Sequence, residues 1–206
     1  MSRPRADAGG LAVRLRRAAR VAIAALALAL ACALPLPAQV RSDEMRVHAA
    51  YLMNFVRYSR WPEPPTGGLV VAVLGTPDSA TVLRDMTRRA GPIHGQPVTV
   101  RLLPLASLAP PAPESTRALS AAAAGAHVLY VADTHRGWAR AASAVASERA
   151  LLTVGTGRDF LGDGGMITLY ADGANVRFAV NAPAIKASRV DVSARLLVLA
   201  RLPGGR

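Results

Sequence analysis

The sequence predicts a single α/β domain in which a mixed, mostly parallel sheet is flanked by helices and ends in an antiparallel C-terminal hairpin. Apolar runs of strand length alternate with helical segments, which favours parallel pairing through right-handed crossovers. The stretch from Asp159 to Asn181 predicts the hairpin, because Asp172-Gly173 is a strong turn signal between two strand-length runs. No linker or internal repeat interrupts the chain after residue 40, so one core is expected.

The first 38 residues predict a cleaved secretory signal peptide, which leaves residues 39–206 as the folded domain. Arginines precede an uncharged apolar segment, Val21 to Leu30, and Leu36-Pro37-Ala38 ends in a small residue suited to cleavage. Two alternatives stay open. One is an uncleaved membrane anchor, since the apolar character runs on to Ala38. The other is a lipid anchor on Cys32, although the usual leucine three residues earlier is missing.

Charge and cysteine content narrow the possible classes of function. The chain has 25 Lys and Arg against 13 Asp and Glu, a net charge of +12. Six of the basic residues and one of the acidic residues lie in the leader, which leaves +7 for residues 39–206. The arginines are scattered and not interleaved with aromatics, so nucleic-acid binding is not expected. Cys32 is the single cysteine, so the domain has no disulfide, cysteine nucleophile or thiolate metal site.

The first expected element of the domain is an amphipathic helix from Asp43 to Arg60. Its apolar residues recur at spacings of four, three and four: Met45, Ala49, Leu52 and Val56. Trp61-Pro62 is expected to end the helix, since the residue before a proline avoids helical geometry. A loop rich in proline and glycine follows, up to Gly68.

Strands and helices then alternate up to the hairpin. Leu69 to Leu74 is a continuous apolar run, as expected for a strand covered on both faces. Gly75-Thr76-Pro77-Asp78 turns the chain into a helix that ends near Arg89. Apolar and polar residues alternate from Val98 to Leu102, which predicts a half-exposed strand. After a proline-rich loop from Pro104 to Pro113, a helix, a strand, a helix and a strand are expected at Ser115 to Ala124, Val128 to Ala132, Gly137 to Ser147 and Leu151 to Val154.

The hairpin is expected to begin with a turn at Gly162, Gly164 and Gly165, which can adopt positive φ. Met166 to Tyr170 forms its first strand. In its second strand, one face is expected to be apolar and the other to face solvent, because Val176, Phe178 and Val180 alternate with Arg177 and Ala179.

Two short elements are expected to close the chain. Asn181 ends the second hairpin strand, and Pro183 is placed to start a helix. A last helix is expected within Val192 to Leu202, docked on the sheet by Leu196, Leu197 and Ala200.

No constellation of residues typical of catalysis is found. The four histidines share no paired metal-binding spacing, and structural or surface roles are expected for them: His48, His94, His127 and His135. Gly155-x-Gly157-x-x-x-x-Gly162 has neither the spacing of a dinucleotide-binding loop nor a P-loop lysine. Three aspartates are close enough in sequence to bind a cation, but aspartate is common in turns: Asp159, Asp163 and Asp172. We therefore expect no enzyme, metal site or cofactor.

The stretch Tyr51-Leu-Met-Asn-Phe-Val-Arg-Tyr-Ser-Arg-Trp-Pro62 resembles the opening helix of the YfiR-like family of bacterial periplasmic proteins, whose Tyr-Leu-x-Asn-Phe signature also ends in Trp-Pro. Three further segments fit in the same order: Val71 to Gly75, Gly164 to Ile167 with Val176 to Asn181, and Ser193 to Ala200. The resemblance covers about Met45 to Leu202. The residues that carry it are Tyr51, Leu52, Asn54, Phe55, Pro62, Gly75, Gly164, Gly165, Phe178, Asn181, Leu196 and Leu197.

The resemblance implies a periplasmic regulator rather than a catalyst. The family's best-known member is a repressor that binds the sensory region of a membrane-anchored diguanylate cyclase, which lowers cyclic di-GMP and restrains biofilm growth. The disulfide-based redox control inferred for family members does not transfer, because residues 39–206 contain no cysteine. The alternative is a small-ligand-binding sensory module that serves another membrane receptor, such as a histidine kinase. A homodimer is left open.

Four residues at the end of the first helix are candidates for partner binding: Arg57, Tyr58, Arg60 and Trp61. Trp61 follows a helix end, where a large aromatic beside arginines is suited to be an exposed anchor. The alternative is that the Trp61 ring folds back under the proline-rich loop. Other signature residues are expected in the core, such as Leu52, Phe55, Phe178 and Leu196, with Gly164 and Gly165 in the turn.

Overall fold

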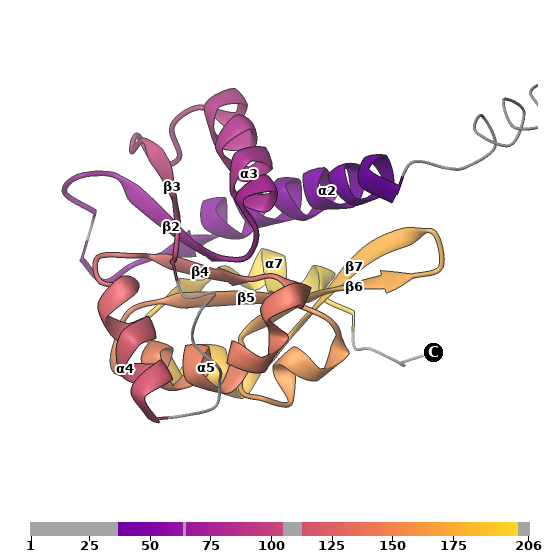
Figure 1. Ribbon diagram of the computed structural model, residues 1–206. Coiled ribbons are helices and arrows are strands. Elements are labelled where there is room, and N and C mark those ends of the chain that lie inside the picture. Colours follow the sequence, from indigo (N-terminus) through magenta and orange to yellow (C-terminus); the bar gives the residue numbers. More distant parts are fainter. Residues whose placement is uncertain (1–36, 64, 105–112, 202–206) are drawn as a thin grey trace, which may run out of the picture. The chain divides into compact units, whose positions relative to one another are not determined.

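The computed structural model describes residues 37–63, 65–104 and 113–201 (Figure 1). Residues from Arg41 onward form one compact unit. Residues 1–36 of the expected signal peptide, with Cys32, lie outside the described residues, as do residues 105–112 of the proline-rich loop and Leu202. In the part of the chain that the structure describes, no helix is both long and apolar enough to cross a membrane.

Six strands form the central sheet, in the order β3-β2-β4-β5-β6-β7. Neighbours from β3 to β6 pair in parallel, and β7 pairs antiparallel with β6 at one edge. The α/β fold predicted from the sequence, with its mostly parallel sheet and antiparallel hairpin, is confirmed. The strands are β2 Leu69–Leu74, β3 Val98–Leu102, β4 Val128–Val131, β5 Leu152–Thr156, β6 Ile167–Asp172 and β7 Asn175–Val180.

Helices cover both faces of the sheet, with α2 and α3 on one face and α4 and α5 on the other (Figure 1). The helix α3 begins where the sequence predicts, because the Thr76 side chain accepts a hydrogen bond from the Ser79 backbone N–H (3.2 Å) and Pro77 fits the first turn. The helical segments are α2 Pro37–Arg57, α3 Pro77–Ala90, α4 Pro113–Ala122, η1 Asp133–Trp138, α5 Ala139–Glu148, η2 Arg158–Leu161, α6 Ala182–Ala187 and α7 Ala194–Leu199.

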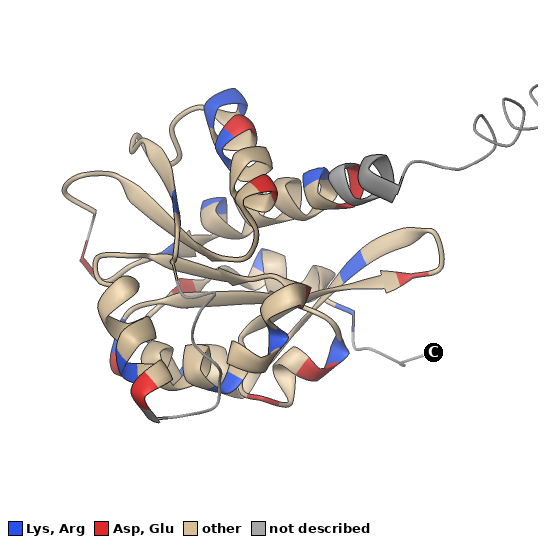
Figure 2. Cartoon of the chain, viewed as in Figure 1, with Lys and Arg blue, Asp and Glu red and all other residues tan. Residues whose placement is uncertain are grey.

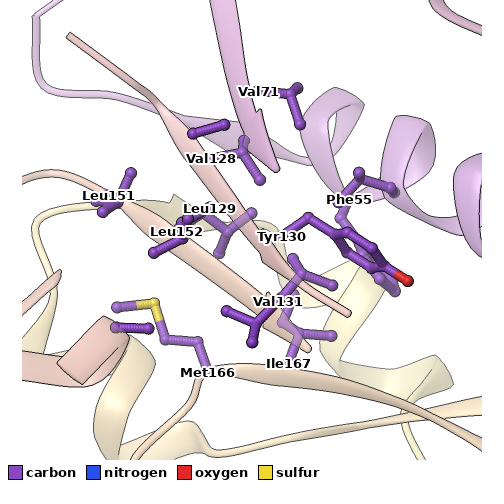
Figure 3. Close-up of a cluster of buried hydrophobic side chains, with 14 of the residues drawn as sticks. Phe55, Val71, Val128, Leu129, Tyr130, Val131, Leu151, Leu152, Met166 and Ile167 are labelled. Carbon is purple, nitrogen blue, oxygen red and sulfur yellow. The ribbon is translucent and has the colours of Figure 1, made fainter. Parts of the chain in front are cut away.

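The core lies on both sides of the middle strands. All four residues of β4 are buried, and β2 is buried at five of its six positions, as its continuous apolar run predicts. Figure 3 shows side chains from α2, β2, β4, β5 and β6 gathered in one cluster, with Phe55 of α2 among them. The helix that carries the family signature is therefore part of the core and not an appended arm.

The first helix differs from the prediction at both ends, because it begins at Pro37 instead of Asp43 and ends at Arg57 instead of Arg60. Ser59 and Arg60 form a short strand, β1, which pairs antiparallel with β8 (Asp191–Val192). The Ser59 hydroxyl donates a hydrogen bond to the Phe55 carbonyl oxygen (2.8 Å), which satisfies a backbone acceptor at the helix end. The pairing joins residues more than a hundred positions apart, so local periodicity gave no sign of it.

The prediction that one face of β7 is exposed to solvent is wrong at Ala179, which has no exposed surface. Ala179 lies opposite Thr168 of β6, which is also fully buried. Phe178, on the other face, is buried as predicted. Both faces of the hairpin are therefore covered near its base, and only its tip, toward Asp172, is exposed.

The glycines before β6 serve two different purposes, whereas positive φ was predicted for all three. Gly164 has a φ of 91°, but Gly162 has a φ of −63°. At Gly165 the backbone needs space instead, because an added Cβ would lie 2.1 Å from Cε1 of Phe160. Gly155 of β5 meets the same ring, at 2.3 Å from Cδ2. The Phe160 ring therefore packs directly against two glycines.

Candidate functional site

Three aromatic rings fix helix α2 onto the last strand of the sheet. The ring centroids of Tyr51 and Phe55 lie 5.8 and 5.2 Å from that of Phe178, and 6.0 Å from each other. The Tyr51 hydroxyl also donates a hydrogen bond to the Val176 carbonyl oxygen on β7 (2.9 Å). Tilted aromatic pairs add about 0.5–1.5 kcal/mol each beyond the burial of their area. The helix end beyond Phe55 is therefore held firmly.

The chain around α7 completes the cover of this edge of the sheet. Leu196 is buried, and Leu197 and Ala200 are half-buried against the core, as the sequence predicts. The Arg201 backbone N–H donates a hydrogen bond to the Phe178 carbonyl oxygen of β7 (2.9 Å). Since β7 is an edge strand with unpaired backbone groups, this contact partly shields it from pairing with another chain.

The α2 corner, defined as Arg57, Tyr58, Arg60 and Trp61, is the site predicted for partner binding. Its first three side chains are exposed, and Tyr58 keeps 39% of its surface. Arg57 donates a hydrogen bond to the Asn54 side-chain oxygen (3.2 Å), and Nη1 of Arg60 lies 2.8 Å from Nδ1 of His94. Among the described residues, no carboxylate forms an ion pair with either arginine.

Backbone hydrogen bonds to the C-terminal part of the chain hold the α2 corner in place. The Ser193 backbone N–H donates a hydrogen bond to the Tyr58 carbonyl oxygen (2.8 Å), next to the pairing of Ser59 with Val192. The β1–β8 ribbon thus places the corner beside the start of α7. Two signature segments far apart in sequence, the opening helix and the segment from Ser193 to Ala200, meet here.

Trp61 is half-buried and bound to the rest of the fold. Its indole N–H donates a hydrogen bond to the His127 carbonyl oxygen (3.1 Å), and its ring meets the His127 ring edge-on at 5.7 Å. Nδ1 of His127 in turn accepts a hydrogen bond from the Val70 backbone N–H (3.1 Å). These contacts give Trp61 a structural role beside the three exposed residues of the corner. A direct role in partner binding stays a prediction.

Comparison with known proteins agrees with the resemblance seen in the sequence. A family model described as YfiR/HmsC-like matches residues 45–201. The chain belongs to this family. No match was found among curated proteins. A crystal structure of a conserved domain protein from Vibrio cholerae O1 biovar El Tor strain N16961 is similar, with a TM-score of 0.51 and 12% identity over 76% of this chain. The chain covers 58% of that structure, and the likeness shows the fold alone.

In this YfiR/HmsC-like domain, the backbone packs closely at one point where many doubly wound sheets bind ligands. The strand order reverses between β2 and β4, and ligands of such folds bind at the carboxyl ends of the strands at that point. The signature residue Gly75 follows β2 here. An added Cβ would lie 2.7 Å from the Ser79 hydroxyl oxygen and 3.2 Å from Cβ of Ala132. Gly75 therefore allows close packing at this point.

Two of the three aspartates considered as possible cation ligands have ion-pair partners within the fold. Asp163 forms an ion pair with Arg140 (2.8 Å), and Asp172 forms one with Arg177 across the hairpin turn. Lysines and arginines are distributed over several elements instead of forming one stripe (Figure 2). No group of three or more potential metal ligands occurs within the described ranges of the chain.

His48 is a buried residue of α2 that lies between a carboxylate and a buried tyrosine. Its Nδ1 is 3.2 Å from the hydroxyl of Tyr130, and its Nε2 is 3.7 Å from the Glu44 carboxylate. Burial lowers the pKa of His48, and the charge of Glu44 opposes that effect only in part. Burial likewise raises the pKa of Tyr130. His48 is therefore held neutral at neutral pH.

We expect the domain to lose stability as the pH falls below about 6.5, the ordinary pKa of histidine. The folded state binds a proton at His48 less readily than the unfolded state, so stability is full above that pH and is lost below it. Melting temperatures of the wild type and of His48→Gln, measured from neutral to mildly acidic pH, check this. The melting temperature of His48→Gln should fall less steeply with pH than that of the wild type, whereas His94→Gln, at an exposed position, is the control. Equal slopes for His48→Gln and the wild type would contradict it.

Sequence reasoning missed two features of this region. It did not predict the β1–β8 ribbon, for which no local signal exists. It also missed the outer face of α7, where Val198 and Leu199 are exposed. The second feature had a signal, since Arg195, Val198 and Leu199 are spaced by three and four residues and so share one helical face.

Proposed function

We propose that this protein is a periplasmic regulator that binds the sensory region of a membrane-anchored diguanylate cyclase and represses it, lowering cyclic di-GMP. Membership of the YfiR/HmsC-like family supports a regulatory role with a protein partner. The observation that carries the proposal is the α2 corner, where Arg57, Tyr58 and Arg60 are exposed on a firmly held helix end.

The chemistry of the corner suits a protein partner. Tyrosine and arginine dominate the residues that contribute most to protein interfaces. The rings of Tyr51, Phe55 and Phe178 and the β1–β8 ribbon hold the corner in place, so little order must be gained on binding. Arg57 and Arg60 have no carboxylate partner within the described chain, which leaves their charges available for an acidic partner surface.

The test has a cellular part and a binding part. Deleting the gene from its host should raise cyclic di-GMP, and the exported protein should restore the low level. The double variant Arg57→Ala with Tyr58→Ala should bind the cyclase's periplasmic region about 30-fold more weakly, as expected for losing two anchors worth about 2 kcal/mol together. The matched control is Arg84→Ala with Arg89→Ala, which removes two exposed arginines from α3.

The two parts of the test distinguish an error in the proposed function from an error in the proposed contact site. If deletion leaves cyclic di-GMP unchanged while the protein is being made, the repressor function is wrong, and a small-ligand sensory module takes its place. If deletion raises cyclic di-GMP but the Arg57 and Tyr58 variant still represses and binds like the wild type, the function stands and the α2 corner is not the contact.

A further inference from the structure

The short helix α7 presents an apolar face to solvent. Val198 is 84% exposed and Leu199 is 64% exposed, the two highest values among the large apolar side chains of the described residues. Arg195 is exposed on the same face, since it lies three and four residues before them. The opposite face, with Leu196, is buried in the core. The helix is therefore anchored by one face and exposes the other.

The chain that leads into and out of this helix is rich in exposed cationic residues. Between Ala182 and Arg201, four exposed cationic residues stand against one carboxylate, Asp191: Lys186, Arg189, Arg195 and Arg201. None of the four cationic side chains forms an ion pair with a described carboxylate. An anionic surface would therefore complement the charge of this segment.

A second copy of the chain fits this surface poorly. A two-fold dimer through α7 would bring Arg195 and Arg201 close to the same pair of arginines in the second copy, and like charges facing each other are unfavourable. Val198 and Leu199 are also not typical of a protein-binding site, because leucine and valine are under-represented among the residues that contribute most to protein interfaces. Aliphatic side chains protruding from a basic surface match instead the acyl boundary and anionic headgroups of a lipid bilayer.

We propose that the outer face of α7 binds an anionic phospholipid bilayer peripherally, with Val198 and Leu199 entering the headgroup–acyl boundary and the surrounding arginines contacting lipid phosphates. The inference does not rest on the proposed repression of a cyclase. It gives the protein a second, independent contact, with the membrane itself. Two contributions stabilise such contact. The electrostatic attraction between arginines and lipid phosphates is weakened by salt, whereas the burial of apolar side chains is not.

The test uses the protein from Gln39 to Arg206, which contains the whole compact unit from Arg41 onward and lacks the apolar leader segment. A cooperative thermal transition first establishes that it is folded. Co-sedimentation is then measured with vesicles of phosphatidylcholine, with and without phosphatidylglycerol. Binding is expected only to the anionic vesicles, and it should weaken as salt is raised.

Two double variants separate the contributions of apolar surface and charge. Val198→Ser with Leu199→Ser should lower vesicle binding about tenfold, since two inserted side chains are lost. Arg195→Gln with Arg201→Gln should also lower it about tenfold or more at low salt. The backbone hydrogen bond from Arg201 to Phe178 does not depend on the replaced side chain. Because all four side chains are exposed, melting temperatures should stay near that of the wild type.

Matched controls change the same chemistry elsewhere. Val47→Ser removes an apolar side chain that is 42% exposed on α2, and Arg84→Gln with Arg89→Gln removes two exposed charges from α3. Both should bind vesicles like the wild type. The proposal is overturned if the protein does not bind anionic vesicles, or if the α7 variants and the controls bind equally. It is also overturned if the serine variant binds vesicles normally but loses a protein partner or self-association.

Discussion

Replacing Phe55 with alanine is expected to lower the free energy of unfolding by about 3–5 kcal/mol, the range found for removing a buried aromatic ring. Phe55 has no exposed surface and lies 5.2 Å, centroid to centroid, from the ring of Phe178. Figure 3 shows it within the cluster that joins α2 to the strands. This loss of stability has two sources. The hydrophobic contribution of the buried ring is removed, and the packed neighbours cannot close the cavity that remains.

Urea unfolding of the wild type and of Phe55→Ala measures this difference. The control is Asn54→Ala, the preceding exposed residue on the same helix, which should change stability by less than about 0.5 kcal/mol. Since Phe55 also holds the α2 corner against β7, partner binding should weaken in Phe55→Ala even where the protein is folded. A loss of less than about 1 kcal/mol would show that α2 is not held by its aromatic contacts.

Adding one methyl group at Gly165 is expected to destabilise the fold by about 3 kcal/mol, near the upper end for overpacking a core. The new Cβ would lie 2.1 Å from Cε1 of Phe160, a ring that is itself buried. The ring cannot simply swing away, because Gly155 lies against it as well. Strain must then move the backbone of the β6 entry or the η2 turn.

A double-mutant cycle tests the cause of this effect. In the background of Phe160→Ala, the change Gly165→Ala should cost less than about 1 kcal/mol, because the clash is gone. Gly67→Ala is the control, since a Cβ there would meet nothing within 4 Å. If Gly165→Ala lowers the free energy of unfolding equally with and without the Phe160 ring, then Gly165 is needed for its backbone conformation and not for the space it leaves.

Part of the candidate site could be predicted from the sequence. The spacing of apolar residues placed Leu52 and Phe55 in the core, and the end of that helix pointed to Arg57, Tyr58 and Arg60, which are exposed. The sequence left two roles open for Trp61, and only its hydrogen bond to His127 shows what the ring contacts. That contact joins residues 66 positions apart, so no local pattern contains it.

The sequence by itself determined the elements whose signals are local. The apolar run from Leu69 to Leu74 became strand β2 with the same bounds, and Asn181 caps helix α6, which has Pro183 in its first turn. Asp172-Gly173 turns the hairpin, with a φ of 61° at Gly173. These outcomes depend on steric limits and backbone hydrogen bonds within a few residues, which amino-acid type sets directly.

Only the tertiary structure decided what lies against each element. It placed Ser59 against Val192, buried Ala179 opposite Thr168, and packed Phe160 between Gly155 and Gly165. It also left Val198 and Leu199 exposed on a helix whose other face is buried. Hydrophobic periodicity states which residues avoid water but not which surface covers them, because that depends on how the whole chain packs.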